Sequence, residues 1–208
     1  MFTVSTLTTF VLIVFGLFLV PGPAVLLTVT RTVQGGRKAG ILAGFGIATG
    51  DLIHTLFAAV GLSAILTTSA AAFHIVKFAG AAYLLYLGIR ALLQKPSDPK
   101  LPNASVQPAL RTYSQAILVE VLNPKTALFF LAFLPQFVHP EQGAPFLQFL
   151  ILGLLFVLLG AIYTTCIALG VSLLSRMTKR LSWLGRWSGK LVGVIYIGLG
   201  LKVAFQSR

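Results

Sequence analysis

A single carboxylate, Asp51, stands inside the apolar stretch GRKAGILAGFGIATGDLIHTLFAAVGLSAIL, residues 36–66. An ionisable group deep in a bilayer costs about 3 kcal/mol or more, so it marks a functional site unless a partner neutralises it. If the helix enters the membrane near Lys38, Asp51 lies roughly 20 Å deep, near the middle of a hydrocarbon core about 30 Å thick. We therefore predict that a helix over about 39–66 buries Asp51 inside a membrane protein. The alternative is a structural acid paired with a nearby Lys or Ser.

Small residues precede this acid in the same stretch. They are Gly36, Gly40, Gly44, Gly46 and Gly50. The first three recur every four residues, and the last two repeat that spacing. Four-residue spacing lets another helix backbone approach closely. The glycine rows therefore predict tight helix packing, either within one chain or between two chains of a homo-oligomer.

The composition of the whole chain excludes a soluble domain. Of its 208 residues 57% are hydrophobic and only 10% are charged, whereas soluble domains average about 25% charged residues. A soluble core of this size cannot bury so much apolar surface. The net charge of +12 would otherwise suggest a nucleic-acid partner. The charges lie between apolar runs, however, so we predict contact with lipid headgroups and no nucleic-acid partner.

Six apolar segments predict an all-α integral membrane protein with six transmembrane helices, forming a single transporter domain over residues 1–208. The segments cover about 6–28, 39–66, 73–93, 113–138, 146–174 and 191–205. The first lacks an N-terminal positive charge, so we interpret it as a retained helix and not a signal peptide. The three loops after the odd-numbered segments carry three (Arg31, Arg37 and Lys38), four (when Arg90 at the end of the third segment is counted) and five Lys or Arg residues, and the two remaining turns carry none. By the positive-inside rule these three loops are cytoplasmic and both termini lie outside.

Prolines interrupt two of the predicted spans. Pro21, Gly22 and Pro23 break the first, and Pro124, within Asn123-Pro124-Lys125, breaks the fourth. Such a break is tolerated in a bilayer only where protein or a water-lined cavity satisfies the freed backbone groups. We therefore predict functional breaks. The alternative for the first is a simple end of the span, with residues 24–30 as an interfacial tail.

The two halves of the chain, about 1–93 and 113–208, resemble an inverted repeat joined by a polar cytoplasmic linker at 94–112. Each half has three spans, so the second enters the membrane upside down. Three residue pairs share one offset: Lys77/Lys190, Gly80/Gly193 and Tyr83/Tyr196. Broken helices at corresponding places in inverted halves predict the midplane site of a secondary transporter. The acid itself is not duplicated near Gly160, and chance similarity between apolar helices is the alternative.

The charged groups predicted at depth are Asp51, Glu120 and Lys125. Burial favours a neutral carboxyl group and a nearby cation favours a charged one, so we predict that Asp51 carries a coupling proton. Lys125 and freed N–H groups at the breaks suit a substrate carboxylate, and Asp51 or Glu120 suits an ammonium. The predicted substrate is a small zwitterion. The alternatives are that Lys125 extends to the outer headgroups and that Glu120 pairs with a cation such as Arg111.

Other functions fit the residues less well. Asp51 and His54 share a helix face, but two ligands are a weak metal signal, and we predict neither a metal nor a cofactor. An intramembrane enzyme using Asp51, His54 or Ser63 lacks a convincing catalytic set, so we predict no enzyme. A cation carrier or channel remains the alternative function, although it would prefer more acids than the spans contain.

Three segments resemble the LysE/RhtB family of amino-acid exporters. They are PGPAVLLTVTRTVQGGRKAGILAGFGIATGDLIHTLFAAVGLSAIL at 21–66, GAAYLLYLGIRAL at 80–92 and NPKTALFFLAFLPQFV at 123–138. The resemblance covers nearly the whole chain. It implies a six-helix carrier of the bacterial inner membrane that exports amino acids against proton entry, with the threonine and homoserine branch nearer than the lysine branch. The site residues it implies are Pro21, Gly22, Pro23, Asp51, Asn123, Pro124 and Lys125.

Overall fold

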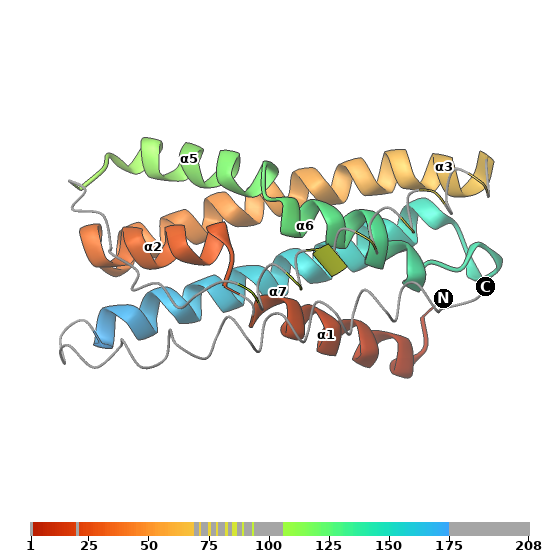
Figure 1. Ribbon diagram of the computed structural model, residues 1–208, viewed down its shortest axis with the longest axis horizontal. Coiled ribbons are helices and arrows are strands. Elements are labelled where there is room, and N and C mark those ends of the chain that lie inside the picture. The colour runs from red at the N-terminus through yellow and green to blue at the C-terminus, as the bar shows by residue number, and fades with distance from the viewer. Residues whose placement is uncertain are drawn as a thin grey trace.

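The computed structural model describes residues 2–19, 21–68 and 106–174, together with isolated positions between 71 and 93. Within this part of the chain every regular element is a helix, in agreement with the predicted all-α class (Figure 1). The elements are α1 (Val4–Phe18), α2 (Pro23–Phe57), the π-helical turn η1 (Ala58–Leu62), α3 (Ser63–Thr68), α5 (Ala109–Val121), α6 (Pro124–Leu128), the π-helical turn η2 (Phe129–Phe133), the 3₁₀ turns η3 (Leu134–Phe137) and η4 (Pro140–Gln142), and α7 (Pro145–Leu174).

Several of these helices are long and apolar enough to cross a membrane. Among the described residues they are Pro23–Ile65 and Pro145–Leu173, and the pair Ala109–Val121 and Pro124–Phe137 makes a third if its 42° bend lies within one span. The second, fourth and fifth predicted spans therefore correspond to observed helices. Most of the third span, all of the sixth and most of the linker lie outside the described residues. The six-helix inverted arrangement and the outside location of the termini thus stay predictions.

The first predicted span is broken at its prolines. α1 ends at Phe18, and α2 begins at Pro23, where a proline at the first helical position needs no hydrogen-bond acceptor. Residues 24–30, the interfacial tail of the alternative, form the first turns of this helix, and Thr28 among them is fully buried. The break at Pro21–Pro23 joins two helices.

Gly36 reverses the direction of α2. Its φ of 74° and ψ of −176° are not helical, and this combination is essentially restricted to glycine. The helix forms a hairpin, with a first arm at residues 23–35 and a second arm at 37–57 (Figure 1). The arms touch, because a Cβ atom placed on Gly40 would collide with the Thr32 hydroxyl. Two predictions are therefore wrong: Gly36 forms a turn and not a packing contact, and Arg31 lies inside a helix and not in a loop.

The other four glycines of this row pack against two different helices. A Cβ on Gly40 or Gly44 would lie 2.9 Å from the Ala168 Cβ or 2.8 Å from the Thr164 hydroxyl of α7. A Cβ on Gly46 or Gly50 would lie 2.5 Å or 3.3 Å from backbone oxygens of α5. All these distances are at or below the closest ordinary contacts, so α2 lies against both neighbours with no room for a side chain. The predicted tight packing is confirmed within one chain.

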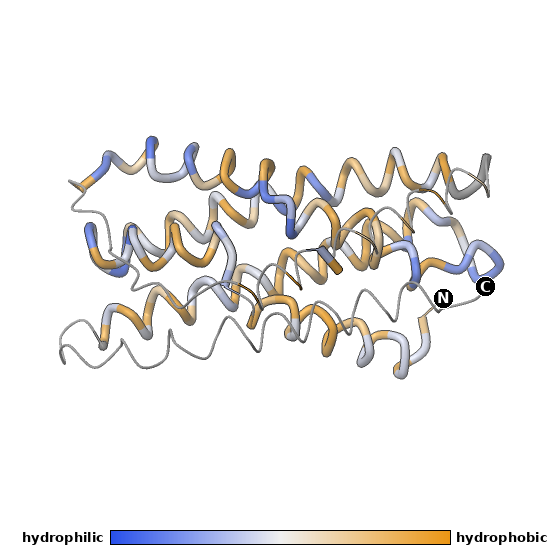
Figure 2. Tube along the Cα trace, in the orientation of Figure 1, coloured by the Kyte–Doolittle hydropathy of each residue, from blue (hydrophilic) through white to orange (hydrophobic). Residues whose placement is uncertain are grey.

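Packed phenyl rings fill the core beside the breaks. The rings of Phe10 and Phe137 lie 5.2 Å apart, and those of Phe129 and Phe156 lie 4.9 Å apart. We call Phe10, Phe129, Phe133, Phe137 and Phe156 the phenylalanine cluster; all are buried. They join α1, η2, η3 and α7 in the half of the bundle away from the Gly36 turn, where apolar residues dominate the trace (Figure 2). The polar residues described next lie at one edge of this core.

Candidate functional site

The two broken helices meet at Lys125. This residue follows Pro124 in the first turn of α6, and only 8% of its surface is exposed. Its ammonium group donates a hydrogen bond of 3.2 Å to the Leu17 carbonyl in the last turn of α1. In an uninterrupted helix that carbonyl would accept from the N–H of residue 21, but Pro21 has none. Lys125 therefore satisfies an acceptor that the first break leaves free, and its Nζ lies 3.5 Å from where a Gly22 Cβ would stand.

A second carbonyl at the end of α1 is satisfied from α7. The Tyr163 hydroxyl donates a hydrogen bond of 2.6 Å to the Phe18 carbonyl, and the two rings stack with centroids 5.2 Å apart. The prediction that protein groups satisfy the freed backbone at the first break is confirmed by Lys125 and Tyr163.

The second break carries a buried polar network. Asn123 caps α6, because its side-chain oxygen accepts from the Lys125 backbone N–H at 3.1 Å. Its amide nitrogen donates to both Glu120 carboxyl oxygens, at 3.3 Å and 3.2 Å. The Thr126 hydroxyl also donates to Glu120. Glu120, Asn123 and Thr126 are each at most 2% exposed, so the residues of this break fix the position of a buried carboxyl group.

Asp51 meets Glu120 across the interface between α2 and α5. The two carboxyl groups are near enough to interact with one another, and Lys125 interacts electrostatically with both. Asp51 is 2% exposed, and its Oδ1 has no hydrogen-bond partner. On its other side stands Gly160 of α7, where a Cβ would lie 3.2 Å from Asp51 Oδ2. Gly160, where the predicted repeat lacks a second acid, thus leaves space for the Asp51 carboxyl group.

These groups line a small cavity of about 30 Å³. This volume holds one or two water molecules. Ala24 and Val25, in the first turn of α2, also line it, and no side chain caps the N-terminus of that helix. The lining therefore combines two carboxyl groups with the ammonium of Lys125 and with a helix N-terminus that has no side-chain cap. Its described lining residues are Phe18, Ala24, Val25, Ile47, Asp51, Glu120, Asn123, Lys125, Thr126, Phe156, Gly160, Tyr163 and Thr164.

The structure excludes two alternatives for the charged residues. Lys125 points into the bundle, so extension to the outer headgroups is wrong. Glu120 contacts Asn123, Thr126 and Asp51 in place of Arg111.

The remaining candidates of the sequence analysis do not form a second reactive site. The His54 ring donates to the Glu120 carbonyl at 3.1 Å and stacks on Phe130, and the Ser63 hydroxyl donates to the Ala59 carbonyl within its own helix. Among the residues described, no group of three potential ligands is placed to hold a metal ion.

Sequence reasoning missed two members of this site. Thr126 and Tyr163 are neutral, and the sequence analysis did not propose either as a site residue. A signal for Tyr163 exists in the sequence, because Phe156, Gly160 and Tyr163 lie on one helical face of α7. That face lines the cavity.

Comparison with known proteins shows the family of the chain. The profile of the family "LysE type translocator" matches residues 14–207. The chain belongs to the LysE family. It is a transport protein of the bacterial inner membrane and not an enzyme.

Relatives of this LysE protein align with it over almost their full length. A protein described as an uncharacterized membrane protein of Pseudomonas aeruginosa is 35% identical over 94% of this chain and 93% of its own. Leucine efflux proteins of Klebsiella pneumoniae and of an Enterobacter strain are each 28% identical, over 90% and 98% of this chain and 89% and 97% of their own. No solved structure gives a significant match.

Proposed function

We propose that this LysE protein exports a neutral amino acid across the inner membrane in exchange for protons. The observation that carries the proposal is the contact between the carboxyl groups of Asp51 and Glu120 in a buried cavity beside Lys125. The names of the leucine efflux proteins support an amino-acid substrate and make leucine a candidate, alongside the threonine or homoserine that the sequence resemblance favours.

The coupling step follows from the chemistry of two adjacent carboxyl groups. Two adjacent buried carboxylates repel one another, so the pair of Asp51 and Glu120 holds one proton when no substrate is bound. The ammonium group of an entering substrate stabilises both groups as carboxylates and takes the place of that proton. Glu120 is held by Asn123 and Thr126, whereas Asp51 Oδ1 has no partner. Asp51 is therefore the group that we assign to proton binding and release.

Other groups in the cavity lining suit the substrate carboxylate. The free N–H groups in the first turn of α2 and the ammonium of Lys125 both favour an anion. A cation carrier or channel fits these groups poorly, because a buried ammonium repels a passing cation. At about 30 Å³ the cavity does not hold an amino acid, so the two broken helices must separate at Leu17 and Lys125 to admit one.

The membrane arrangement belongs to the same proposal. Six spans in a single domain, with inverted halves 1–93 and 113–208 and both termini outside, place the two breaks at equivalent points of the repeat. The hydrogen bond from Lys125 to Leu17 supports this arrangement, because it brings the two proline breaks together.

The test is counterflow and efflux of labelled amino acids, including leucine, threonine and homoserine, in proteoliposomes with and without a pH gradient. We expect Asp51→Asn to abolish proton-coupled efflux while the protein remains folded in the membrane. The control is Glu141→Gln, which neutralises an exposed acid in the turn before α7 and should leave transport unchanged. Normal coupled efflux in the Asp51→Asn protein would refute the proposal.

A further inference from the structure

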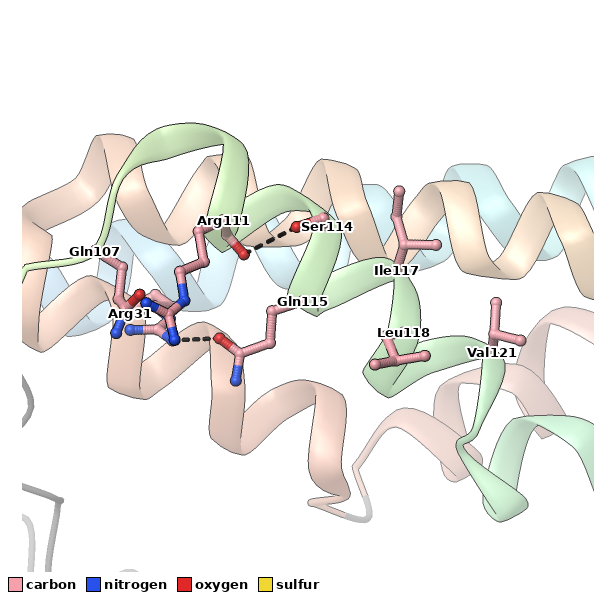
Figure 3. Close-up of a pocket in the computed structure, with 8 residues that line it drawn as sticks. All are labelled: Arg31, Gln107, Arg111, Ser114, Gln115, Ile117, Leu118 and Val121. Carbon is pink, nitrogen blue, oxygen red and sulfur yellow. Dashed lines mark hydrogen bonds between the residues drawn. The ribbon is translucent and has the colours of Figure 1, made fainter.

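A second, larger cavity lies between the first arm of α2 and the N-terminal part of α5. It is an open groove with a volume of about 760 Å³, and exposed side chains such as Leu118 lie along it. Figure 3 shows Arg31 and Arg111 at one end with Gln107, and Ile117 and Leu118 further along α5. This cavity lies toward the Gly36 turn, the end that carries the predicted cytoplasmic loops.

Arg31 gives this cavity a positive charge that no acid among the described lining residues compensates. It is 6% exposed, and its guanidinium donates to the amide oxygens of Gln34, at 2.9 Å, and of Gln115. Both acceptors are neutral, and its Nε–H has no partner. Arg111 adds a second cation, and the described lining residues include no acid. A buried charge without a counter-charge is strongly unfavourable, so the site favours a bound anion.

An unsatisfied acceptor belongs to a residue that lines the same cavity. The Gln107 Oε1 atom is buried and has no hydrogen-bond donor. The two arginines therefore offer donors for a carboxylate, and a rotation of the Gln107 side chain would bring its buried oxygen to an ammonium in the cavity. Ile117 and Leu118 supply an apolar wall beside these polar groups.

We propose that this cavity is a second binding site, which takes a neutral amino acid with an apolar side chain before it reaches the Asp51 cavity. Arg31 and Arg111 bind the carboxylate, Gln107 accepts from the ammonium, and Ile117 and Leu118 contact the side chain. The inference rests on the proposed amino-acid substrate. Two arginines repel a cationic side chain, so lysine binds more weakly here than leucine.

The two sites lie at different heights along α5 and on opposite faces of it, because nine residues make about two and a half helical turns, so a substrate moves around the helix to pass from one to the other. Arg111 and Glu120 are nine residues apart on this helix, which corresponds to about 14 Å. A substrate bound at the arginines is thus separated from the coupling carboxyl groups by about one or two lengths of an amino-acid molecule. The larger cavity concentrates the substrate on the entry side, and the smaller one couples its passage to a proton.

The experiment measures equilibrium binding of labelled leucine to the purified full-length protein, together with leucine counterflow in proteoliposomes. The variants are Arg111→Gln and Gln107→Leu, since neither side chain makes a hydrogen bond within the described structure. The matched controls are Arg37→Gln, beside the Gly36 turn, and Gln142→Leu, on an exposed turn. We expect both test variants to raise the leucine Kd and KM about tenfold or more with Vmax unchanged, because each removes one charge-assisted hydrogen bond. Both controls should behave as wild type, and excess lysine should not displace leucine.

A wild-type leucine affinity in both test variants would overturn the assignment. A wild-type protein that binds no leucine would overturn it as well. If an anionic lipid headgroup occupied the pocket, the wild-type protein would require phosphatidylglycerol in the vesicles for activity. Arg111→Gln would remove that requirement. The leucine KM in vesicles of phosphatidylcholine alone would then be the same for the variant and the wild type. That outcome also rejects the amino-acid site. Coupled efflux by the Asp51→Asn protein tests the proposed function separately, because it leaves leucine binding at the arginines intact.

Discussion

Adding one methyl group at Gly50 should move the carboxyl groups of Asp51 and Glu120 apart. In Gly50→Ala the new Cβ would lie 2.6 Å from the Glu120 Cβ and 3.3 Å from the Ile117 carbonyl oxygen. Ordinary carbon–carbon contacts are about 3.5–4.0 Å, so α5 must recede by about 1 Å. Neither neighbour is the flexible end of a side chain. Because Gly50 precedes Asp51 directly, this displacement separates Asp51 from Glu120.

The size of the effect follows from two opposing contributions. Overpacking in a filled core costs about 1–3 kcal/mol, and the rigid neighbours place Gly50→Ala near the upper end. Alanine stabilises a helix by about 0.5–1 kcal/mol relative to glycine, which leaves a net loss of about 2 kcal/mol. On a scale of about 2–4 °C per kcal/mol for a chain of this length, Tm falls by about 4–8 °C. A misplacement of about 1 Å at the site should also reduce efflux tenfold or more.

The assay compares Gly50→Ala with Gly61→Ala, using thermal unfolding in detergent and leucine efflux in vesicles. A Cβ on Gly61 meets no described atom within 4 Å. This control therefore gains only the helix stabilisation, and its Tm should rise by about 1–4 °C with normal efflux. Equal Tm and equal efflux in the two variants would refute the reasoning that α2 and α5 are in closest contact beside the carboxyl groups.

Three further substitutions separate structural from transport roles. Lys125→Met removes the donor to the Leu17 carbonyl, which costs about 1–3 kcal/mol, and it removes the cation beside the carboxyl groups. We expect a lower Tm and no efflux. Retained efflux would show that the lysine only caps α1. Tyr163→Phe removes one neutral hydrogen bond worth about 1 kcal/mol and should lower Tm while efflux stays within a fewfold of wild type, whereas complete loss of efflux would give the hydroxyl a direct transport role. Gly36→Ala should destabilise the protein by about 1–3 kcal/mol because of the positive φ, and Gly170→Ala, a helical glycine with no described neighbour in contact, should not; equal unfolding temperatures would contradict the turn assignment.

The covalent structure of proline made the breaks predictable from sequence. Pro21, Pro23 and Pro124 cannot donate a backbone hydrogen bond, so they interrupt a helix wherever they lie in its interior. The contact between the two breaks could not be read from either helix alone, because the hydrogen bond from Lys125 to Leu17 joins residues 108 positions apart. Periodicity describes one helix at a time and carries no information on such a contact.

Glycine and arginine show where local patterns mislead. A spacing of four residues assigned Gly36 to the same packing row as Gly40 and Gly44, although only backbone dihedral angles separate a turn glycine from a packing glycine. The positive charge of Arg31 led us to predict that it lies in a loop, because arginine is rarely buried. Its burial depends on Gln34 and Gln115, whose amide oxygens the sequence does not mark as partners.

In the proposed export mechanism, the phenylalanine cluster blocks one way out of the Asp51 cavity. Phe156 borders that cavity, and the other rings continue from it toward the far end of the bundle within one hydrophobic core. Five aromatic side chains in edge and stacked contact form a dry barrier, and a hydrated zwitterion cannot cross it in this arrangement. In the proposed mechanism, release on that side requires the rings to turn aside together, and the closed cluster would block proton leak when no substrate is bound.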